Sequence, residues 1–565
     1  MNLVIDIETT GLDPYKHEIL CIGIISEGVE HYILPDDFKW KTWFVSGVTI
    51  IGHNIKFDMK FLIVKYNIPE KDYLLFNYGD TEIMSRLIDE NGLHSLKDLS
   101  KIILKYSDKN YNSMKEKRKI LTKEMEGLSN YVLQDCRNTS KLFDIFSELI
   151  TKDYKEIYEI EMGAFPYIMQ MELVGHKIGM PLLDKKIDEF IKYLEEEKLK
   201  IDRFFEDEIS LLSIDNAEEA KILVECVFNK KGIYSFNFLS TKQLGIYLRY
   251  KKIELPITEK GTYRVDKNIL ETIDIPIIKN ILEYKKNSKL LNTYFYGIRD
   301  NLYKERVRCN FRQIEAVTGR MSCSNPNLQN QPRDDKRVRE MFIPKKDNNL
   351  VYFDYCSQEM RIFAHYTNDI EYVRLIEERD IHAETANMIG LDKEKDRGVG
   401  KTINFAILYG AGAKKIAEQL EIKENDAKKL LELYYNAFPC CKKLRNEIER
   451  VVNSRGYIKT FFGRRRHLLK EEGYKALNSL IQGGCADIIK ISIRRVGGYL
   501  KDNNLKSRIV LVIHDEIVLE IPDEEMHIIQ DIKNIMEDFK FRIKLPVEVN
   551  YTDKNWAEKG EYYAY

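Results

Sequence analysis

Three polar residues interrupt an apolar run near the C-terminal end of the chain. Residues 508–522 read RIVLVIHDEIVLEIP, so two short strands joined by a tight turn are expected around His514, Asp515 and Glu516. The turn lacks the glycine or asparagine that two-residue hairpin turns favour. Either the two carboxylates simply lie on a solvated turn, or they have a functional role for which an unfavourable turn sequence is kept.

Another acid, Asp354, ends a second apolar strand in NNLVYFDYCSQEMRIFAHYTND (348–369), just before a helix-like segment. Two acids from separate strands of one sheet, each flanked by apolar residues, make a good pair of ligands for two Mg²⁺ ions. Two-metal phosphoryl transfer requires such a pair. Asp354 and Asp515 are therefore expected to share one site.

The first 150 residues contain a separate set of acids. In VIDIETTGL, Asp6 and Glu8 lie two apart on a predicted strand, which directs both carboxylates to one face. Asp58 begins a predicted helix in GHNIKFDMKF, while Tyr131 and Asp135 in SNYVLQDCRNT are four apart and share a helical face. Converging carboxylates without thiols or paired histidines favour hard cations such as Mg²⁺ or Mn²⁺. This is the chemistry of phosphodiester cleavage.

A stripe of cations and aromatics runs through DRGVGKTINFAILYGAG (396–412). Arg397, Lys401, Phe405 and Tyr409 recur every four residues, so one helix face carries all four. Such a face could hold a triphosphate at its cationic end and stack a base at its aromatic end. The alternative is an amphipathic helix with its aromatics in the core and its cations in solvent.

The elements that position these residues must form several domains. The chain has 565 residues, 44% of them hydrophobic, which is enough for three or four packed domains. From about residue 152 to residue 300 the pattern is helical, and Ser240 is predicted to cap a helix. The formal net charge of -1 gives no global sign of a polyanionic partner, but residues 299–346 carry 12 basic and 6 acidic residues and could meet phosphates.

Cysteine usage and the N-terminus bear on the cellular compartment. The nine cysteines show no CxxC spacing and are predicted to be reduced thiols. No run reaches membrane-spanning length, and the N-terminus lacks the pattern of a secretory signal. The protein is expected to be soluble and cytoplasmic, in a bacterial cell or a phage-infected host cell, without a membrane partner.

These motifs resemble two known families. The first 150 residues are similar to proofreading 3′→5′ exonucleases, whose signature is three Asp, one Glu and one Tyr. Segments 348–369, 396–412 and 508–522 resemble motifs A, B and C of the family A DNA polymerases, the group that contains bacterial DNA polymerase I, in the same order and spacing. Also similar are AVTGRMSCSNPNLQNQP (316–332), DIHAETANMIG (380–390), GYIKTFFGRRRH (456–467) and NSLIQGGCADIIK (478–490). The resemblance covers nearly the whole chain.

The resemblance implies an α/β and α+β multidomain fold, in which an RNase H-like exonuclease domain precedes a right-hand polymerase. The implied domains are 1–150 for the exonuclease, 151–300 for a linker and the helical thumb, 301–372 for the first part of the palm with motif A, 373–474 for the fingers with motif B, and 475–565 for the second part of the palm with motif C. Since no 5′ nuclease domain precedes Met1, the chain is expected to hold only the polymerase and proofreading portions and not to remove primers or flaps.

The resemblance also implies the metal ligands. Asp354 and Asp515 would hold two Mg²⁺ ions at the polymerase site, with the Tyr355 carbonyl completing a site and Glu516 close by. At the exonuclease site two further ions are implied, with Mn²⁺ as a substitute for Mg²⁺. The residues implied there are the metal ligands Asp6, Glu8, Asp58 and Asp135, and Tyr131, which would position the attacking water.

Other residues are implied to contact the nucleotide or the DNA. Glu359, five residues after Asp354, would be the steric gate that crowds a ribose 2′-OH. The remaining contacts implied are His382, Arg397 and Lys401 with the triphosphate, Phe405 with the nucleotide, Tyr409 with the pocket around the nascent pair, Arg320 and Gln482 with the primer-template minor groove, and His514 with the primer backbone.

Three departures from the family pattern affect the polymerase motifs. Motif A usually reads DYSQIE and here reads DYCSQE, so Cys356, Ser357 and Gln358 alter the surroundings of the gate. In motif B, Gly398 stands where a second arginine is common and Ala406 where glycine is common. Phe405, in place of tyrosine, resembles members that select against dideoxynucleotides. None of these changes removes an implied ligand.

The function predicted is that of a template-dependent DNA polymerase with 3′→5′ proofreading, which uses primer-template DNA and dNTPs and acts as a monomer. Replication accessory proteins are possible partners, and the sequence does not identify them. One alternative is a single-subunit RNA polymerase, against which Glu359 and the attached exonuclease argue. Two others are a DNA-binding exonuclease with an inactive polymerase domain, and a polymerase with an inactive exonuclease.

Overall fold

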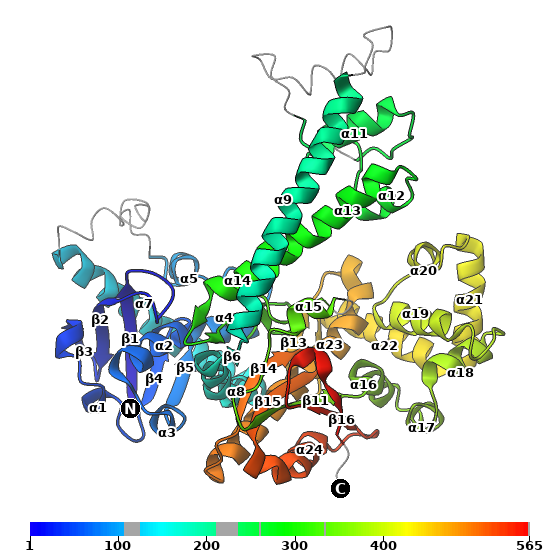
Figure 1. Cartoon of the computed structure of the whole chain (residues 1–565). Coiled ribbons are helices and arrows are strands. Elements are labelled where there is room, and N and C mark those ends of the chain that lie inside the picture. Colours follow the sequence, from blue (N-terminus) through cyan, green and yellow to red (C-terminus); the bar gives the residue numbers. More distant parts are fainter. Residues whose placement is uncertain (107–124, 211–235, 259–260, 333–334, 563–565) are drawn as a thin grey trace. The chain divides into compact units, whose positions relative to one another are not determined.

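The computed structural model describes residues 1–106, 125–258, 261–332 and 335–562 except 211–235 (Figure 1). The chain forms two compact units, each described here by itself. The first comprises Met1–His176, Arg308–Asn330 and Pro344–Tyr565, and the second comprises Lys177–Val307 and Gln331–Ile343. The second unit is thus built from two separate stretches of sequence.

A five-stranded mixed sheet begins the first unit. Its strands, in the spatial order β3-β2-β1-β4-β5, are β1 (Asn2–Thr9), β2 (Ile19–Ser26), β3 (Val29–Ile33), β4 (Thr49–Gly52) and β5 (Asn77–Asp80). β1 pairs antiparallel with β2 and parallel with β4. The helices of this region are α1 (Trp40–Trp43), α2 (Ile55–Tyr66), α3 (Glu70–Tyr73), α4 (Thr81–Ile88), α5 (Leu96–Ile102) and α7 (Met125–Leu149). α7 packs against β1 and β2, which brings its buried face over the strand that carries Asp6 and Glu8.

A helical connection follows the sheet without a break. The π-helical turn Ile150–Tyr154 joins α7 to α8 (Lys155–Val174), and α8 packs along α23 (Ala476–Asp502). Most side chains in the second half of α8 are buried. This helix therefore lies in the core of the first unit, beneath residues from the far end of the sequence.

A second five-stranded sheet, entirely antiparallel, holds the C-terminal motifs. The order is β14-β15-β11-β16-β17, with β11 (Asn348–Tyr355), β14 (Arg508–Ile513), β15 (Glu516–Pro522), β16 (Val547–Thr552) and β17 (Gly560–Glu561). Every residue of β15, which lies between β14 and the central β11, is buried. The helices α16 (Gln358–Thr367), α23 and α24 (Ile529–Glu537) belong to the same region. The hairpin predicted at 508–522 is confirmed.

A helical region lies between β11 and α23 in the sequence. It consists of α17 (Ile370–Glu378), α18 (Ile381–Met388), α19 (Arg397–Leu408), α20 (Ala413–Leu420), α21 (Glu424–Ala437) and α22 (Pro439–Arg455), and it ends in the hairpin β12 (Tyr457–Lys459) and β13 (Arg465–His467). Another short hairpin pairs β9 (Asn310–Arg312) with β10 (Ser322–Ser324). The helix predicted for the stripe is confirmed from Arg397, and Tyr409 forms its C-terminal cap.

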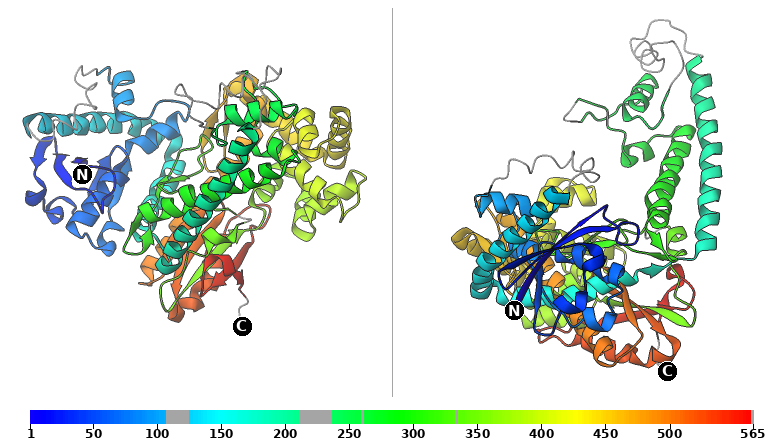
Figure 2. Two further views of the ribbon diagram at one scale, coloured as in Figure 1. Left: turned by 45° about the horizontal axis from the view of Figure 1, so that its top comes forward. Right: turned by 90° about the vertical axis from the view of Figure 1, so that its left-hand side faces the viewer.

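The second unit is built on a pair of long helices. α9 (Met180–Ser210) and α13 (Pro276–Lys289) lie side by side in each view of Figure 1 and Figure 2. Its other elements are α11 (Thr241–Tyr250), α12 (Lys267–Glu271), α14 (Tyr296–Asp300), α15 (Lys336–Arg339), β7 (Leu302–Tyr303) and β8 (Arg306–Val307), which pairs with β6 (His176–Lys177). Ser240 caps α11 by accepting the Gln243 N–H, as predicted. Within the described ranges, no helix is both long and apolar enough to cross a membrane.

Candidate active sites

Three acids of the first sheet region converge on one point. Carboxylate oxygens of Asp6, Glu8 and Asp135 all lie within 4.8 Å of one another. Asp6 and Glu8 lie two residues apart on β1 and so share one face of the strand. Asp135 approaches them from α7, where Tyr131 lies one turn earlier. Because every donor is a carboxylate oxygen, the set suits a hard divalent cation. The predicted convergence of these acids is confirmed, while their role as ligands remains a prediction.

Asp58 joins this cluster from the first turn of α2. Its carboxylate accepts the Ile7 N–H at 3.1 Å, so it is tied to the strand between Asp6 and Glu8. Burial raises the pKa of Asp58 well above its ordinary value, and repulsion from Asp80 and Glu8 adds to the shift. A bound cation would remove this penalty by favouring the charged form.

Asp80, which the sequence analysis did not single out, organises the same region. It caps α4, and its carboxylate also accepts the N–H groups of Asn54 at 3.1 Å and Ile55 at 3.0 Å, where α2 begins. Burial raises the pKa of Asp80 to about 7. The sequence signal for it was present, since Asp before Thr-Glu-Ile is a typical N-cap.

The second sheet brings the other predicted acids together. β11 pairs with β15 so that Asp354 stands opposite Glu516, and the Tyr355 N–H donates to the Asp515 carbonyl at 3.3 Å. Burial raises the pKa of Asp354 to about 7, with further contributions from Asp515 and Glu516. Asp354 and Asp515 therefore share one site, as predicted from their places at the ends of apolar strands.

The hairpin turn has the backbone conformation that its sequence disfavours. His514 is exposed and has a φ of 56°, in the left-handed region that a non-glycine residue rarely adopts.

The Tyr355 side chain is buried, and its hydroxyl donates to the Met536 carbonyl at 2.6 Å. The group of Tyr355 that could serve a metal is therefore its backbone carbonyl.

Lys559 is a further residue of this site that sequence reasoning missed. Its ammonium pairs with Glu516 and lies 4.5 Å from the centroid of the Tyr352 ring. It comes from the segment between Trp556 and β17, at the end of the described chain. No local pattern distinguishes this lysine from the many exposed ones, so only the fold reveals its position.

The predicted stripe on α19 meets residues of α18. Arg397 pairs with Asp380 at 2.6 Å, and His382 Nδ1 lies 3.1 Å from the Asn404 amide nitrogen. Gly400 permits this approach, because a Cβ there would lie 2.1 Å from the His382 carbonyl oxygen. The ring centroids of His382 and Phe405 are 5.7 Å apart, and those of Phe405 and Tyr409 are 5.9 Å apart. Lys401 is exposed.

Glu359 is held by two of the predicted contact residues. One of its carboxylate oxygens pairs with Arg320, and the other accepts the Tyr409 hydroxyl at 3.1 Å. In the altered motif A, Ser357 adopts a left-handed φ of 51° and Gln358 is buried, so the helix that carries Glu359 still begins directly after the strand of Asp354. Gln482 is half-buried on α23.

Comparison with protein families agrees with this two-site arrangement. The family described as 3′-5′ exonuclease matches residues 2–151, and the family described as DNA polymerase family A matches residues 206–558. Because the second match covers more than half of the chain, the chain belongs to DNA polymerase family A. This confirms the resemblance predicted from motifs A, B and C.

Several individual proteins are similar to this chain. DNA polymerase I of Borreliella burgdorferi is 31% identical over 98% of this chain and 62% of its own length. The thermostable DNA polymerase I of Thermus aquaticus is 34% identical over 62% of this chain and 45% of its own. The chain thus spans about three fifths of the length of the first relative.

A solved structure also resembles the fold. It is the POL domain of Pol1 from M. smegmatis in complex with DNA primer-template and dNTP, with a TM-score of 0.79 and 22% identity over 98% of this chain and 96% of that one. The mixed α/β architecture predicted from the sequence is confirmed by this likeness.

Proposed function

We propose that this chain extends a DNA primer on a template by adding dNTPs and removes misincorporated nucleotides with a separate 3′→5′ exonuclease site. The observation that carries the proposal is the pairing of β11 with β15, which places Asp354 beside Asp515 and Glu516. Family membership and the similarity to bacterial DNA polymerase I support it.

At the polymerase site, the chain's own residues would bind and orient the reactants. Two Mg²⁺ ions held by Asp354, Asp515 and the Tyr355 carbonyl would supply activation of the primer 3′-OH and charge stabilisation at the α-phosphate. Arg397, Lys401 and His382 would bind the triphosphate, which is why a helix face with two cations is needed beside the acids. Pyrophosphate leaves as the primer is extended by one nucleotide.

The dNTP pocket would be closed on its sugar side by Glu359. Its carboxylate is held by Arg320 and Tyr409, which favours the position that would meet the sugar. Tyr409 and Phe405 would border the nascent base pair, and Arg320 and Gln482 the minor groove. His514, exposed at the turn beside Asp515, would support the primer backbone.

At the exonuclease site, Asp6, Glu8, Asp58 and Asp135 would hold the cations. The ions there, Mg²⁺ or Mn²⁺, would supply an activated water and stabilise the departing 3′ oxygen. Tyr131 would orient the water from the same face of α7. Burial raises the pKa of Asp58, and a cation beside it would favour the charged form, which fits this role.

The test is extension of a labelled primer-template with Mg²⁺ and four dNTPs, run beside Asp515→Ala and Asp6→Ala. We expect Asp515→Ala to lose extension and keep hydrolysis of a single strand, and Asp6→Ala to show the reverse. Asp531→Ala, at an exposed acid that accepts a hydrogen bond from Tyr499, is the matched control and should retain both activities. Wild-type protein that shortens primers but never extends them would contradict the polymerase assignment.

A further inference from the structure

Four consecutive basic residues, 464–467, contact carboxylates of the same chain. Such a run in a DNA polymerase ordinarily indicates contact with phosphates. Here the side chains of Arg464, Arg465 and Arg466 are only 6%, 18% and 11% exposed. All four side chains contact carboxylates from the first 176 residues of the chain, so they are already engaged by protein.

The first arginine is buried in the core. Arg464 pairs with Glu161 of α8 and, at 2.7 Å, with Asp487 of α23. Lys490 of α23 donates to the same Glu161 at 2.5 Å and to the Gly319 carbonyl at 2.8 Å. Two cations and two carboxylates thus balance in a site that excludes water. Removal of one member would leave an uncompensated buried charge, which makes this contact poorly suited to a test.

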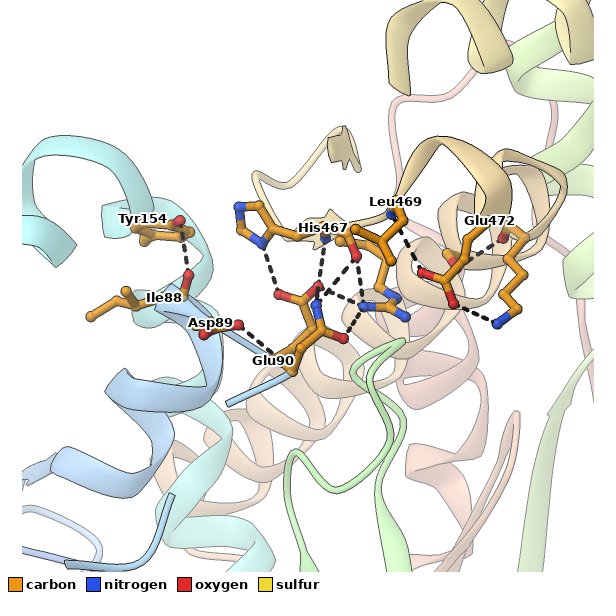
Figure 3. Close-up of polar contacts among 11 residues, drawn as sticks. Ile88, Asp89, Glu90, Tyr154, His467, Leu469 and Glu472 are labelled. Atoms are coloured by element: carbon orange, nitrogen blue, oxygen red, sulfur yellow. Dashed lines mark hydrogen bonds and ion pairs between the residues drawn. The ribbon is translucent and has the colours of Figure 1, made fainter. Parts of the chain in front are cut away.

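The second arginine contacts the π-helical turn that follows α7. Arg465 pairs with Asp153 at 2.7 Å, and its guanidinium lies 4.6 Å from the centroid of the Tyr154 ring. The Tyr154 hydroxyl donates to the Ile88 carbonyl at 3.3 Å (Figure 3). The π-helical turn therefore contacts both strand β13, through Arg465, and the end of α4, through Tyr154.

The third and fourth basic residues converge on Glu90, in that same loop (Figure 3). Glu90 accepts from Arg466 Nη1 at 2.9 Å, from the His467 N–H at 2.5 Å and lies 3.0 Å from His467 Nδ1. Its side chain is only 5% exposed. Asn91 adds a bond from its amide to the His467 carbonyl at 3.3 Å. A single carboxylate thus fixes two successive residues of β13.

We propose that residues 464–467 form a docking clamp, which holds the exonuclease region against the polymerase region and thereby sets the path of a primer strand between the two sites. Glu90, Asp153 and Glu161 are its acidic counterparts. The inference rests on the proposed function, because it assigns a positioning role for both of those activities. The clamp touches neither set of catalytic acids, so each active site keeps its own chemistry when the clamp is loosened.

The test compares Glu90→Gln with wild type in three assays: extension of a matched primer, hydrolysis of a single-stranded oligonucleotide, and excision of a 3′-mispaired primer in the presence of excess unlabelled DNA as a trap. We expect the first two rates to be unchanged and the trapped excision to fall about fivefold, as the loss of about one good interaction would give. Hydrogen exchange should quicken in 88–92 and 457–467.

Glu30→Gln is the matched control. Glu30 makes a two-bond pair with Arg137, at 2.6 Å for each bond, wholly within the exonuclease region. This substitution also removes an arginine–carboxylate pair, one that lies at the surface and not between the two regions, and should leave trapped excision unchanged. Arg466→Gln, alone and combined with Glu90→Gln, completes a double-mutant cycle, in which the combined loss should be smaller than the product of the two single losses.

Two results would overturn the clamp. One is trapped excision by Glu90→Gln that equals wild type, and the other is an equal fall in single-strand hydrolysis, which would locate the effect inside the exonuclease site. Asp153→Asn, which loosens Arg465, provides a second variant if Glu90→Gln does not fold. Absence of extension or hydrolysis in the wild-type protein would instead contradict the proposed function, and the exchange measurement would still test the clamp.

Discussion

Tyr409, at the end of α19, donates its hydroxyl hydrogen to Glu359 of α16 at 3.1 Å, while Arg320 pairs with the second oxygen of the same carboxylate. Two segments far apart in the sequence therefore hold one acid that a third segment carries. A side chain held by two partners can exclude a substrate by shape, because moving it aside would break both contacts.

Glu359→Ala is expected to admit ribonucleotides. The substitution removes the carboxylate that would crowd a ribose 2′-OH, so the preference for dNTP over rNTP, measured as the ratio of kcat/KM values, should fall by about a hundredfold. Glu359→Gln keeps the volume and should keep most of the preference. Efficient rNTP use by the wild type would instead favour the RNA polymerase alternative.

Arg397→Ala is expected to weaken nucleotide binding more than catalysis. Arg397 pairs with Asp380 at 2.6 Å in the structure and would exchange this partner for the triphosphate. Loss of a charge-assisted contact should raise the KM for dNTP by about tenfold with a smaller change in kcat. Arg374→Ala, an exposed arginine of α17 that pairs with Glu371 and Glu378, serves as the control and should leave KM unchanged.

Asp354→Asn is expected to stabilise the metal-free protein at high pH while it abolishes extension. Burial raises the pKa of Asp354 to about 7, so its charged form costs stability in full above pH 7, and this cost shrinks steadily as the pH falls from 7 toward the ordinary pKa of an aspartate. With EDTA at pH 8, the variant should gain about 1 kcal/mol in the free energy of unfolding.

The same measurement at pH 5 should show a smaller gain, since the wild-type carboxyl is then protonated in the folded state while it is still ionised in the unfolded chain. Addition of Mg²⁺ at pH 8 should raise the melting temperature of the wild type more than that of the variant. A variant that is less stable than wild type at pH 8 would contradict this interpretation.

Asp80→Ala is expected to impair the exonuclease site indirectly, by loosening the helices that position its acids. The carboxylate accepts backbone N–H groups at the starts of both α2 and α4, so its loss should cost about 2 kcal/mol of stability. Single-strand hydrolysis should fall more than extension because α2 carries Asp58. Asp266→Ala removes an exposed N-cap from α12 and should change neither activity. Equal losses of both activities in Asp80→Ala would indicate global unfolding instead.

The sequence by itself determined the local elements and the residues they present. Alternation along β1 placed Asp6 and Glu8 on one face, a repeat of four aligned Arg397 with Tyr409, and the interrupted apolar run predicted the hairpin at Asp515; the structure contains each of these. Such patterns are legible because the periods of strands and helices depend on the backbone alone.

Only the tertiary structure decided which distant residues meet. Antiparallel pairing of β11 with β15 set Asp354 opposite Glu516, and the run 464–467 turned out to pair with acids of the first 176 residues. The partners Lys559 and Glu90 lie in segments with no distinguishing pattern. Side-chain pairing across the fold depends on packing between elements, and no local period in the sequence records that packing.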